Sequence, residues 1–247
     1  MKNKNLQKSL NKHLTFGTFV VGKANESAFK LAKRITSCRS KDKAIYICNK
    51  EPGLGVTHLI QAIAWKIGKK HPRQKVIYIN ADEFLTQFVR SLKNDTTAEL
   101  RKYYENNVYC FILDDFSRFN KMACLQDYLR PIIEKRIKHG KLTIIGGYIP
   151  KNIKLLHKNL LDTINGIIVA EIHPPGFDLR LAILRKIQER EGTSFDDKTL
   201  KLFARHIKKS VRLLEGAMYR LMVSSKVIRD IPSDKIARDM LTEKCYK

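Results

Sequence analysis

The sequence predicts an α/β fold: a parallel sheet flanked by helices, followed by a small all-helical domain. Three observations lead to this prediction. Short, continuous apolar runs alternate with stretches of helical periodicity over most of the chain. After Pro174 and Pro175 only helical patterns remain. Strands that are apolar throughout are typical of parallel sheets, in which helices bury both faces.

The elements follow one another in a regular order. A first helix is expected at 27–36, where apolar residues recur at helical spacing. Five strands are expected at 44–48, 75–80, 108–113, 142–145 and 167–172, and the helices between them at 57–70, 81–93, 96–105 and 122–138. The final part of the chain contains four expected helices, at 178–191, 196–207, 210–226 and 233–244.

This order divides the chain into three predicted regions. Residues 1–14 are polar and lysine-rich, and we expect a loose basic arm. Residues 15–175 form the α/β domain, and residues 176–247 form the helical domain. No run of 18 apolar residues and no signal-peptide core occurs, so the chain is expected to be cytoplasmic and not to contact membranes.

Charge is the most informative feature of the composition. The chain has 48 lysines and arginines against 24 acidic residues, a net charge of +24. Such an excess favours polyanionic partners, nucleic acids above all. A general lysine bias that serves only solubility is the alternative. The five cysteines are scattered without metal-ligand spacing, and no metal-binding cluster is expected from them.

The segment 44–70 has the layout of a phosphate-binding loop, in which a strand, a glycine turn and a helix follow one another. Glycines let backbone N–H groups face a phosphate, and the helix N-terminus adds positive potential. The full motif is G-x-x-x-x-G-K-[ST]. Residues 50–57 read KEPGLGVT, so the last glycine and the hydroxyl are present. Lys50 stands at the first glycine position and Val56 at the lysine position.

The valine is the more serious departure. A lysine at this point neutralises the terminal phosphates, and a hydrogen bond to a charged group is worth about 1.5–3 kcal/mol. Its loss weakens nucleotide binding by roughly tenfold to a hundredfold. Whether Lys50 reaches back to a phosphate is left open. Gly53 and Gly55 could also serve only to turn the chain.

An acidic pair follows the expected strand 108–113. In phosphate-loop proteins the first such acid holds Mg²⁺ and the next can orient a water molecule. These positions are Asp114 and Asp115, and Thr57 would be the second metal ligand. Solvated acids at a strand end are the alternative explanation.

Together these motifs resemble the AAA+ module of the DnaA family of bacterial replication initiators. The similar segments are 15–25, 52–59, 113–115, 174–175, 180–184 and 211–217, and the resemblance runs from about residue 15 to 245. It implies a helical lid over the α/β domain and binding of ATP or ADP with Mg²⁺. It also implies nucleotide contacts from Pro52, Gly53, Leu54, Gly55, Val56, Thr57, His58 and, at the sensor 2 position, Arg212.

Two further motifs depart from the family pattern. The sensor 1 stretch 145–148 reads IGGY and lacks the polar residue, and the arginine-finger stretch 160–164 contains no arginine. Nothing resembling the family's duplex-reading helix-turn-helix domain is recognised up to Lys247. We therefore do not expect efficient ATP hydrolysis.

The resemblance also suggests a nucleic-acid contact on the helix 84–93. The corresponding family helix touches single-stranded DNA, which places Val89, Arg90 and Lys93 at a backbone, with Arg101 and Lys102 nearby. Such binding would depend on salt and read little sequence. A solvated basic helix face is the alternative.

These observations favour a DnaA-like protein of replication initiation or its regulation, with weak or lost ATP binding. Its partners would be DNA, single-stranded or bound non-specifically, and a DnaA-like initiator or another AAA+ subunit. One alternative is a working ATP-binding initiator in which Lys50 or a partner's residue replaces the missing lysine. Another is a basic single-stranded-DNA-binding module.

Overall fold

The computed structural model describes residue 6 and residues 9–37, 42–149, 156–227 and 233–243. The chain divides into two compact units. The first contains residues 1–19, 27–50 and 56–172, and the second contains residues 20–26, 51–55 and 173–247. Within the described ranges, no helix is long and apolar enough to cross a membrane.

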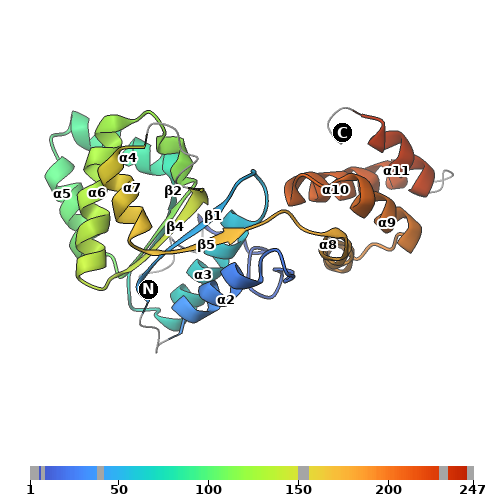
Figure 1. The fold of residues 1–247 in the computed structure, drawn as a ribbon, viewed down its shortest axis with the longest axis horizontal. Coiled ribbons are helices and arrows are strands. Elements are labelled where there is room, and N and C mark those ends of the chain that lie inside the picture. Colours follow the sequence, from blue (N-terminus) through green and yellow to red (C-terminus); the bar gives the residue numbers. More distant parts are fainter. Residues whose placement is uncertain (1–5, 7–8, 38–41, 150–155, 228–232, 244–247) are drawn as a thin grey trace. The chain divides into compact units, whose positions relative to one another are not determined.

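The first unit is built on a five-stranded, wholly parallel sheet (Figure 1). Its strand order is β2-β3-β4-β1-β5, so the central strands are covered on both faces. In Figure 1, α2 and α3 lie on one side of the sheet, and α4, α6 and α7 lie on the other. The strands are β1 (Ala44–Asn49), β2 (Val76–Asn80), β3 (Cys110–Asp114), β4 (Leu142–Tyr148) and β5 (Ile168–Ile172); the helices are α2 (Glu26–Ile35), α3 (Val56–Lys70), α4 (Ala81–Lys93), α5 (Thr97–Lys102), α6 (Ala123–Lys138) and α7 (Lys158–Asn165).

The predicted fold class is confirmed, and each predicted strand is present with small shifts in its bounds. The helix expected at 96–105 is an α-helix only to Lys102 and continues as a π-helical turn, η1 (Tyr103–Asn107). Strand β4 runs to Tyr148, three residues past the predicted end, because Gly146 and Gly147 pair with β1 instead of turning the chain. Helix α7 and the 3₁₀ turn η2 (Phe116–Phe119) were not predicted.

The N-terminal segment differs from the expectation of a loose arm. Leu6 and Leu10 are buried, and a Cβ on Gly68 of α3 would lie 2.7 Å from the Leu6 side chain. The N–H of Asn11 donates to Gln61 at 2.9 Å, and its carbonyl accepts from the Trp65 indole at 3.0 Å. The prediction of a loose arm is therefore wrong for the described part of this segment, which packs along α3. Apolar residues spaced four apart, at 6 and 10, allow this packing.

The second unit is helical and has a hydrophobic core of its own. Four helices surround Leu184, Phe203, Leu214, Met218 and Leu221, which are all fully buried. The helices are α8 (Phe177–Glu191), α9 (Asp197–His206), α10 (Val211–Val227) and α11 (Ser233–Leu241), as the periodicity predicted.

Candidate functional site

The turn between β1 and α3 contains two glycines with positive φ. Gly53 and Gly55 have φ values of +78° and +109°, a region that glycine occupies without steric cost. A Cβ on Gly53 would also collide with the Ser210 hydroxyl and lie 2.9 Å from Cβ of Arg212. Both glycines are therefore needed for this conformation. Pro52 beside them is exposed, and Leu54 is buried.

Residues 51–55 belong to the second unit through their contacts with the start of α10. The carbonyl of Gly53 accepts hydrogen bonds from the Arg212 N–H at 3.2 Å and from the Ser210 hydroxyl at 3.3 Å. The Arg212 side chain is exposed, and among the described residues its guanidinium has no ion pair. Burial raises the pKa of Glu215, one turn along α10, against the opposing effects of Arg190 and Arg212. Arg212 thus lies in the first turn of α10 beside the loop, with an exposed side chain.

Val56, at the lysine position, begins α3 and is turned into the first unit. It is only 6% exposed. A Cβ built on Gly146 would lie 2.9 Å from Val56 Cγ1, 2.9 Å from Ile60 Cδ1 and 3.4 Å from an Asp114 oxygen. The valine methyl group therefore fills space that the missing side chain of Gly146 leaves.

Asp114, at the end of β3, is a buried carboxylate with three hydrogen-bond donors around it. Tyr78 donates to one oxygen at 2.7 Å, and the N–H of Asp115 donates to the other at 2.8 Å. The Thr57 hydroxyl donates as well. Burial raises the pKa of Asp114, and these three hydrogen bonds oppose the shift. The two proposed Mg²⁺ ligands, Thr57 and Asp114, are thus in direct contact.

Two residues of this network were not identified from the sequence. Tyr78 on β2 accepts from the Gln61 amide at 2.9 Å, and Gln61 on α3 accepts from the N–H of Asn11 at 2.9 Å. Burial, followed by the charge of Asp114, raises the pKa of Tyr78, so the phenol keeps its proton and remains a donor. The available signal was Gln61, a polar residue on the otherwise apolar face of α3.

The Asp115 side chain lies at the surface, whereas that of Asp114 is buried. Asp115 occupies the left-handed region with φ of +57°, and its side chain is 57% exposed. Its carboxylate lies 3.6 Å from Arg118, which also pairs with Asp82 at 2.9 Å. The two acids of the predicted pair therefore serve separate networks, one buried and one at the surface.

His58 and Lys50 flank the loop and make local contacts. The His58 ring lies 3.0 Å from the carbonyl of Thr15 and 3.2 Å from the Thr18 hydroxyl, and packs edge-on against Phe19. It thus anchors residues 15–19 to α3. The Lys50 amino group is exposed and lies 4.0 Å from Glu171 on β5.

The sensor 1 stretch is glycine-rich because its surroundings leave no room for side chains. A Cβ on Gly147 would lie 2.8 Å from the Tyr46 hydroxyl and 2.9 Å from the Ser117 hydroxyl. Those two groups bond to Tyr148, whose N–H donates to Ser117 at 2.6 Å and whose carbonyl accepts from Tyr46 at 2.7 Å. Side-chain hydroxyls from β1 and η2 thus occupy the space beside this strand.

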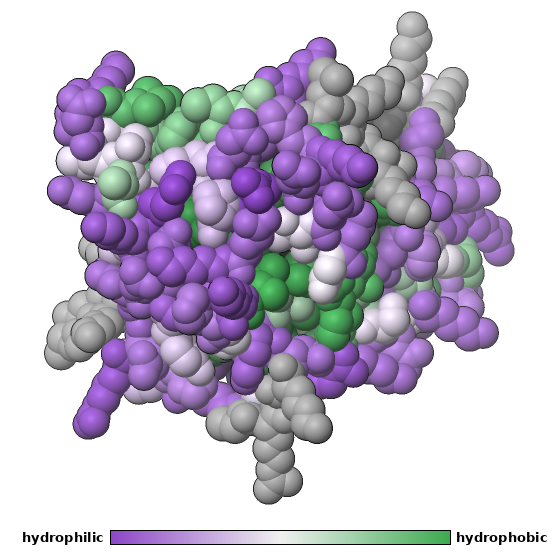
Figure 2. All heavy atoms as spheres, turned by 60° about the vertical axis from the view of Figure 1, so that its left-hand side comes forward, coloured by the Kyte–Doolittle hydropathy of each residue, from purple (hydrophilic) through white to green (hydrophobic). Residues whose placement is uncertain are grey.

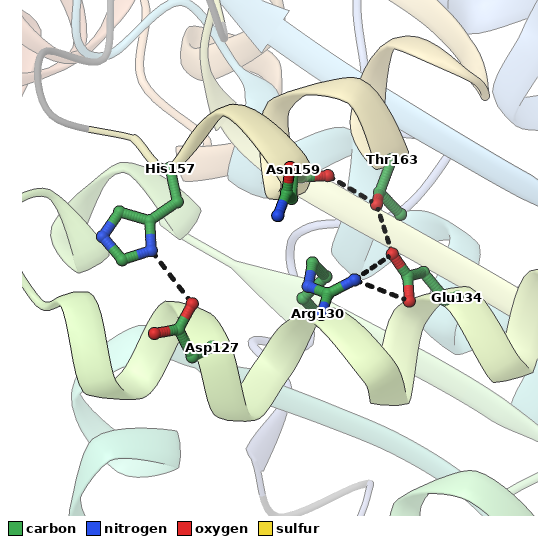
Figure 3. Close-up of polar contacts among 6 residues, drawn as sticks. All are labelled: Asp127, Arg130, Glu134, His157, Asn159 and Thr163. Carbon is green, nitrogen blue, oxygen red and sulfur yellow. Dashed lines mark hydrogen bonds and ion pairs between the residues drawn. The ribbon is translucent and has the colours of Figure 1, made fainter.

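The arginine-finger stretch lies on α7, which is fixed to α6 by polar contacts (Figure 3). Leu160 and Ile164 point into the core. On the outer side the Thr163 hydroxyl donates to Glu134 at 3.0 Å, and Glu134 pairs with Arg130 at 2.9 Å. At the start of α7, His157 lies 2.9 Å from Asp127. In Figure 3 the Arg130 guanidinium is thus engaged by Glu134 between the two helices.

The predicted nucleic-acid residues share the exposed side of α4. Val89 is 40% exposed, and Arg90 and Lys93 are exposed with no ion pair among the described residues. Leu92, which is 49% exposed, extends this group. The guanidinium of Arg101 instead stacks over the Tyr128 ring at 5.3 Å. The structure therefore brings together the α4 set and leaves Arg101 out of it.

The surface around these elements is polar. Figure 2 shows one face on which hydrophilic residues predominate and hydrophobic ones form limited patches. In the described ranges, no group of three or more histidine, cysteine or acidic side chains is placed to hold a metal ion. A bound Mg²⁺ would therefore depend on phosphate oxygens and water besides Thr57 and Asp114.

The sequence matches one family model, described as the bacterial DnaA ATPase domain, over residues 10–170. The chromosomal replication initiator protein DnaA of Lactobacillus johnsonii is 31% identical over 235 residues, which are 95% of this chain and 52% of that protein. DnaA of Jannaschia sp. is 29% identical over 240 residues, again 95% of this chain and 50% of that protein. The chain thus spans about half the length of these curated relatives.

Solved structures show the same likeness. Domain III of the Thermotoga maritima replication initiation protein DnaA superposes with a TM-score of 0.88 at 27% identity, covering 96% of this chain and 98% of that one. A replication initiator DnaA bound to AMPPCP and single-stranded DNA gives a TM-score of 0.78 at 25% identity, covering 87% of this chain and 66% of that one.

Proposed function

The chain belongs to the bacterial DnaA ATPase-domain family, and from this premise we propose that it acts in the initiation of chromosomal replication or its regulation. It binds DNA, a DnaA-like initiator, or both, with a nucleotide site of weak or lost affinity. The observation that carries the loss of affinity is the buried side chain of Val56 at the lysine position.

The remaining parts fit a nucleotide that binds weakly. The loop glycines have positive φ values, and the Arg212 side chain is exposed. Thr57 and Asp114 are the two oxygen ligands suited to Mg²⁺. A bound Mg²⁺ would neutralise part of the phosphate charge. The missing component is the lysine cation, whose contact accounts for roughly tenfold to a hundredfold in affinity.

The decisive test is equilibrium binding of a fluorescent ATP analogue with Mg²⁺ to the native chain and to Val56→Lys. We expect millimolar binding by the native chain and micromolar binding by the variant. Val56→Met is the matched control, because it lengthens the side chain without adding charge, and it should bind like the native chain. Micromolar binding by the native chain would contradict the proposal. Loss of that binding in Lys50→Gln would then identify Lys50 as the replacement cation.

Single-stranded DNA is the proposed nucleic-acid ligand of α4. A structure similar to this chain is that of a DnaA bound to single-stranded DNA. Val89, Arg90 and Lys93 present one apolar and two cationic side chains on a helix that Phe84 and Phe88 anchor in the core. Backbone contacts of this kind give salt-dependent binding without sequence reading.

The test is binding of a labelled oligothymidine by the native chain and by Arg90→Gln/Lys93→Gln at several salt concentrations. Because each lost phosphate contact lowers the slope of log K against log salt by about 0.7 for a single strand, the slope should fall by about 1.4. Lys121→Gln/Lys158→Gln, which removes two exposed charges elsewhere, should leave the slope unchanged. Equal losses in both variants would show that only net charge matters.

A further inference from the structure

One edge of the sheet gathers positive charge that the proposed function does not use. In a parallel sheet the helices return the chain, so the ends of α2, α3 and α6 lie at the same edge as the starts of the strands. Residues 33–37, 42–44, 69–76 and 138–142 form this basic edge. Their ionisable side chains are the acid Asp42 and the bases Lys33, Arg34, Lys43, Lys69, Lys70, His71, Arg73, Lys75, Lys138, His139 and Lys141.

Contacts across the edge show that these segments lie side by side. The Lys70 amino group donates to the carbonyl of Thr36 at 2.8 Å, which joins the ends of α3 and α2. The ring of His71 lies 5.1 Å from that of Tyr109, which precedes β3. On the other side, a Cβ on Gly140 would lie 3.9 Å from the Lys43 side chain. The basic edge is therefore one surface built from distant parts of the chain.

Further contacts extend this surface towards η1. The Lys75 amino group lies 4.4 Å from the centre of the Tyr103 ring. The Lys141 amino group donates to the carbonyls of Glu105 and Asn106, at 2.6 and 2.9 Å. Two lysine side chains of the basic edge thus contact η1.

Little negative charge balances this surface. Asp42 pairs with Arg34 at 2.6 Å. Glu105 on η1 is buried and pairs with Lys135 at 2.7 Å. The pKa of Lys141 is lowered by burial and then by the neighbouring charges of Arg136 and Lys135, against the opposing effect of Glu105. Like charges are therefore held close enough to repel one another.

Helix geometry explains only part of the pattern. Cations in a last turn interact favourably with the helix dipole, each contributing about 0.3–1 kcal/mol. This interaction accounts for two pairs of cations: Lys33 and Arg34 in the last turn of α2, and Lys69 and Lys70 in the last turn of α3. Arg73 and Lys75 stand in the connection between α3 and β2, outside any helix, and they add to the repulsion without a gain from a helix dipole. Cations concentrated on a surface in this way fit an external polyanion.

We propose that the basic edge is a second nucleic-acid surface, which binds the phosphate backbone of double-helical DNA. A duplex carries about one charge per 1.7 Å of its axis, and its rigid backbone suits cations held on helix ends and strand starts. In the described part of the edge, the neighbouring tyrosine rings already have partners that compete with a stacked base, since the Lys75 amino group lies over Tyr103 and the His71 ring packs against Tyr109. None of its described residues is an exposed large hydrophobic of the kind that inserts into a lipid surface.

The edge and the α4 site are separate in their chemistry. α4 presents the exposed apolar side chains of Val89 and Leu92 beside its cations, whereas no described residue of the basic edge is an exposed large hydrophobic. The last turn of α4 is directed to the same edge of the sheet, and α5 and η1 follow before β3 begins. The two surfaces together would let the chain hold a duplex next to a single strand.

The test measures three probes with the full chain: a labelled 20-base-pair duplex, a labelled oligothymidine, and phosphatidylserine vesicles. The edge variant is Lys69→Gln/Arg73→Gln/Lys138→Gln, which changes three exposed side chains that make no ion pair or hydrogen bond with another described residue. The control is Lys121→Gln/Lys158→Gln/Lys226→Gln, which removes the same charge from exposed positions elsewhere. Circular dichroism and a thermal melt establish that both variants are folded.

For the edge variant we expect duplex affinity to fall at least about tenfold at 100 mM salt and the salt slope to fall by about 2–3, since each duplex contact contributes about 0.9. Its binding of oligothymidine should remain near the native value, and the control should keep its duplex affinity. Equal weakening in the control, or loss of vesicle binding with the duplex unaffected, would overturn the proposal. If the α4 site does not bind single-stranded DNA, only the oligothymidine measurement will show it. The two proposals can therefore be refuted independently.

Discussion

The two edges of the sheet in the first unit carry charges of opposite sign. They also differ in how far these charges are paired within the protein or exposed to solvent. At the carboxyl ends of the strands lie Asp82, Glu83, Asp114, Asp115 and Glu171, of which Asp114 is enclosed by three donors. At the amino ends lie the cations of the basic edge, most of them exposed. At the first edge the charge of Asp114 is satisfied within the protein, whereas at the second most of the charge is left to solvent and ligands. A buried, ordered network suits a defined small ligand, whereas exposed like charges suit an extended polyanion.

The largest expected effect concerns Arg136, a cation near the basic edge whose side chain is fully buried. Its guanidinium donates to the Thr143 hydroxyl at 3.1 Å and to four backbone carbonyls, those of Tyr104, Val108, Tyr109 and Leu142. Burial lowers its pKa to about 10. Arg136→Met leaves these acceptors without a donor, and we expect it to lower the free energy of unfolding by about 3–5 kcal/mol.

Urea denaturation measures this loss. Lys138→Met, two residues along the same helix and exposed, is the control and should change the stability by less than about 0.5 kcal/mol. Equal stability of the two variants would mean that the carbonyls around Arg136 find other donors. The buried cation would then contribute no more to stability than the exposed Lys138.

A smaller effect is expected at the other edge, where Gly146 gives space to Val56. The added methyl group of Gly146→Ala lies 2.9 Å from both Val56 Cγ1 and Ile60 Cδ1, so we expect a loss of about 1–3 kcal/mol. Val56→Ala removes one of the two crowded groups. A double-mutant cycle should therefore show that the pair is less destabilising than the sum of the single substitutions. Simple additivity would mean that the valine does not occupy this space.

The smallest effect concerns the pH dependence of stability through Asp114. The pKa of this acid is raised on folding, so the folded chain keeps the proton to a higher pH than the unfolded chain does. The folded state thus binds more protons just above the ordinary carboxyl pKa, and this group's contribution to stability falls as pH rises through that window. Melting temperatures from pH 4 to 8 should show a decline in the native chain that is reduced in Asp114→Asn. An equal decline in both proteins would assign it to other groups.

The candidate site was only partly predictable. Gly53, Gly55, Thr57 and Asp114 were proposed as site residues because a strand, a turn and a helix follow in order, and the structure places the Thr57 hydroxyl against Asp114. Tyr78 and Gln61 were missed because their partners are 36 and 17 residues away in sequence. The role of Gly146 and Gly147 was missed for the same reason, since only packing against α3, β1 and η2 shows why no side chain fits there.

Local patterns determined the order of strands and helices, the parallel character of the sheet and the change to an all-helical region after Pro175. They did so because burial on both faces, or on one, imposes a periodicity that can be read along the chain. The packed N-terminal segment, α7, the separation of Asp114 from Asp115 and the basic edge emerged only from the folded chain. These features depend on contacts between residues far apart in sequence. Their energies are set when the sheet brings helix ends and strand ends together, and no pattern along a single segment records them.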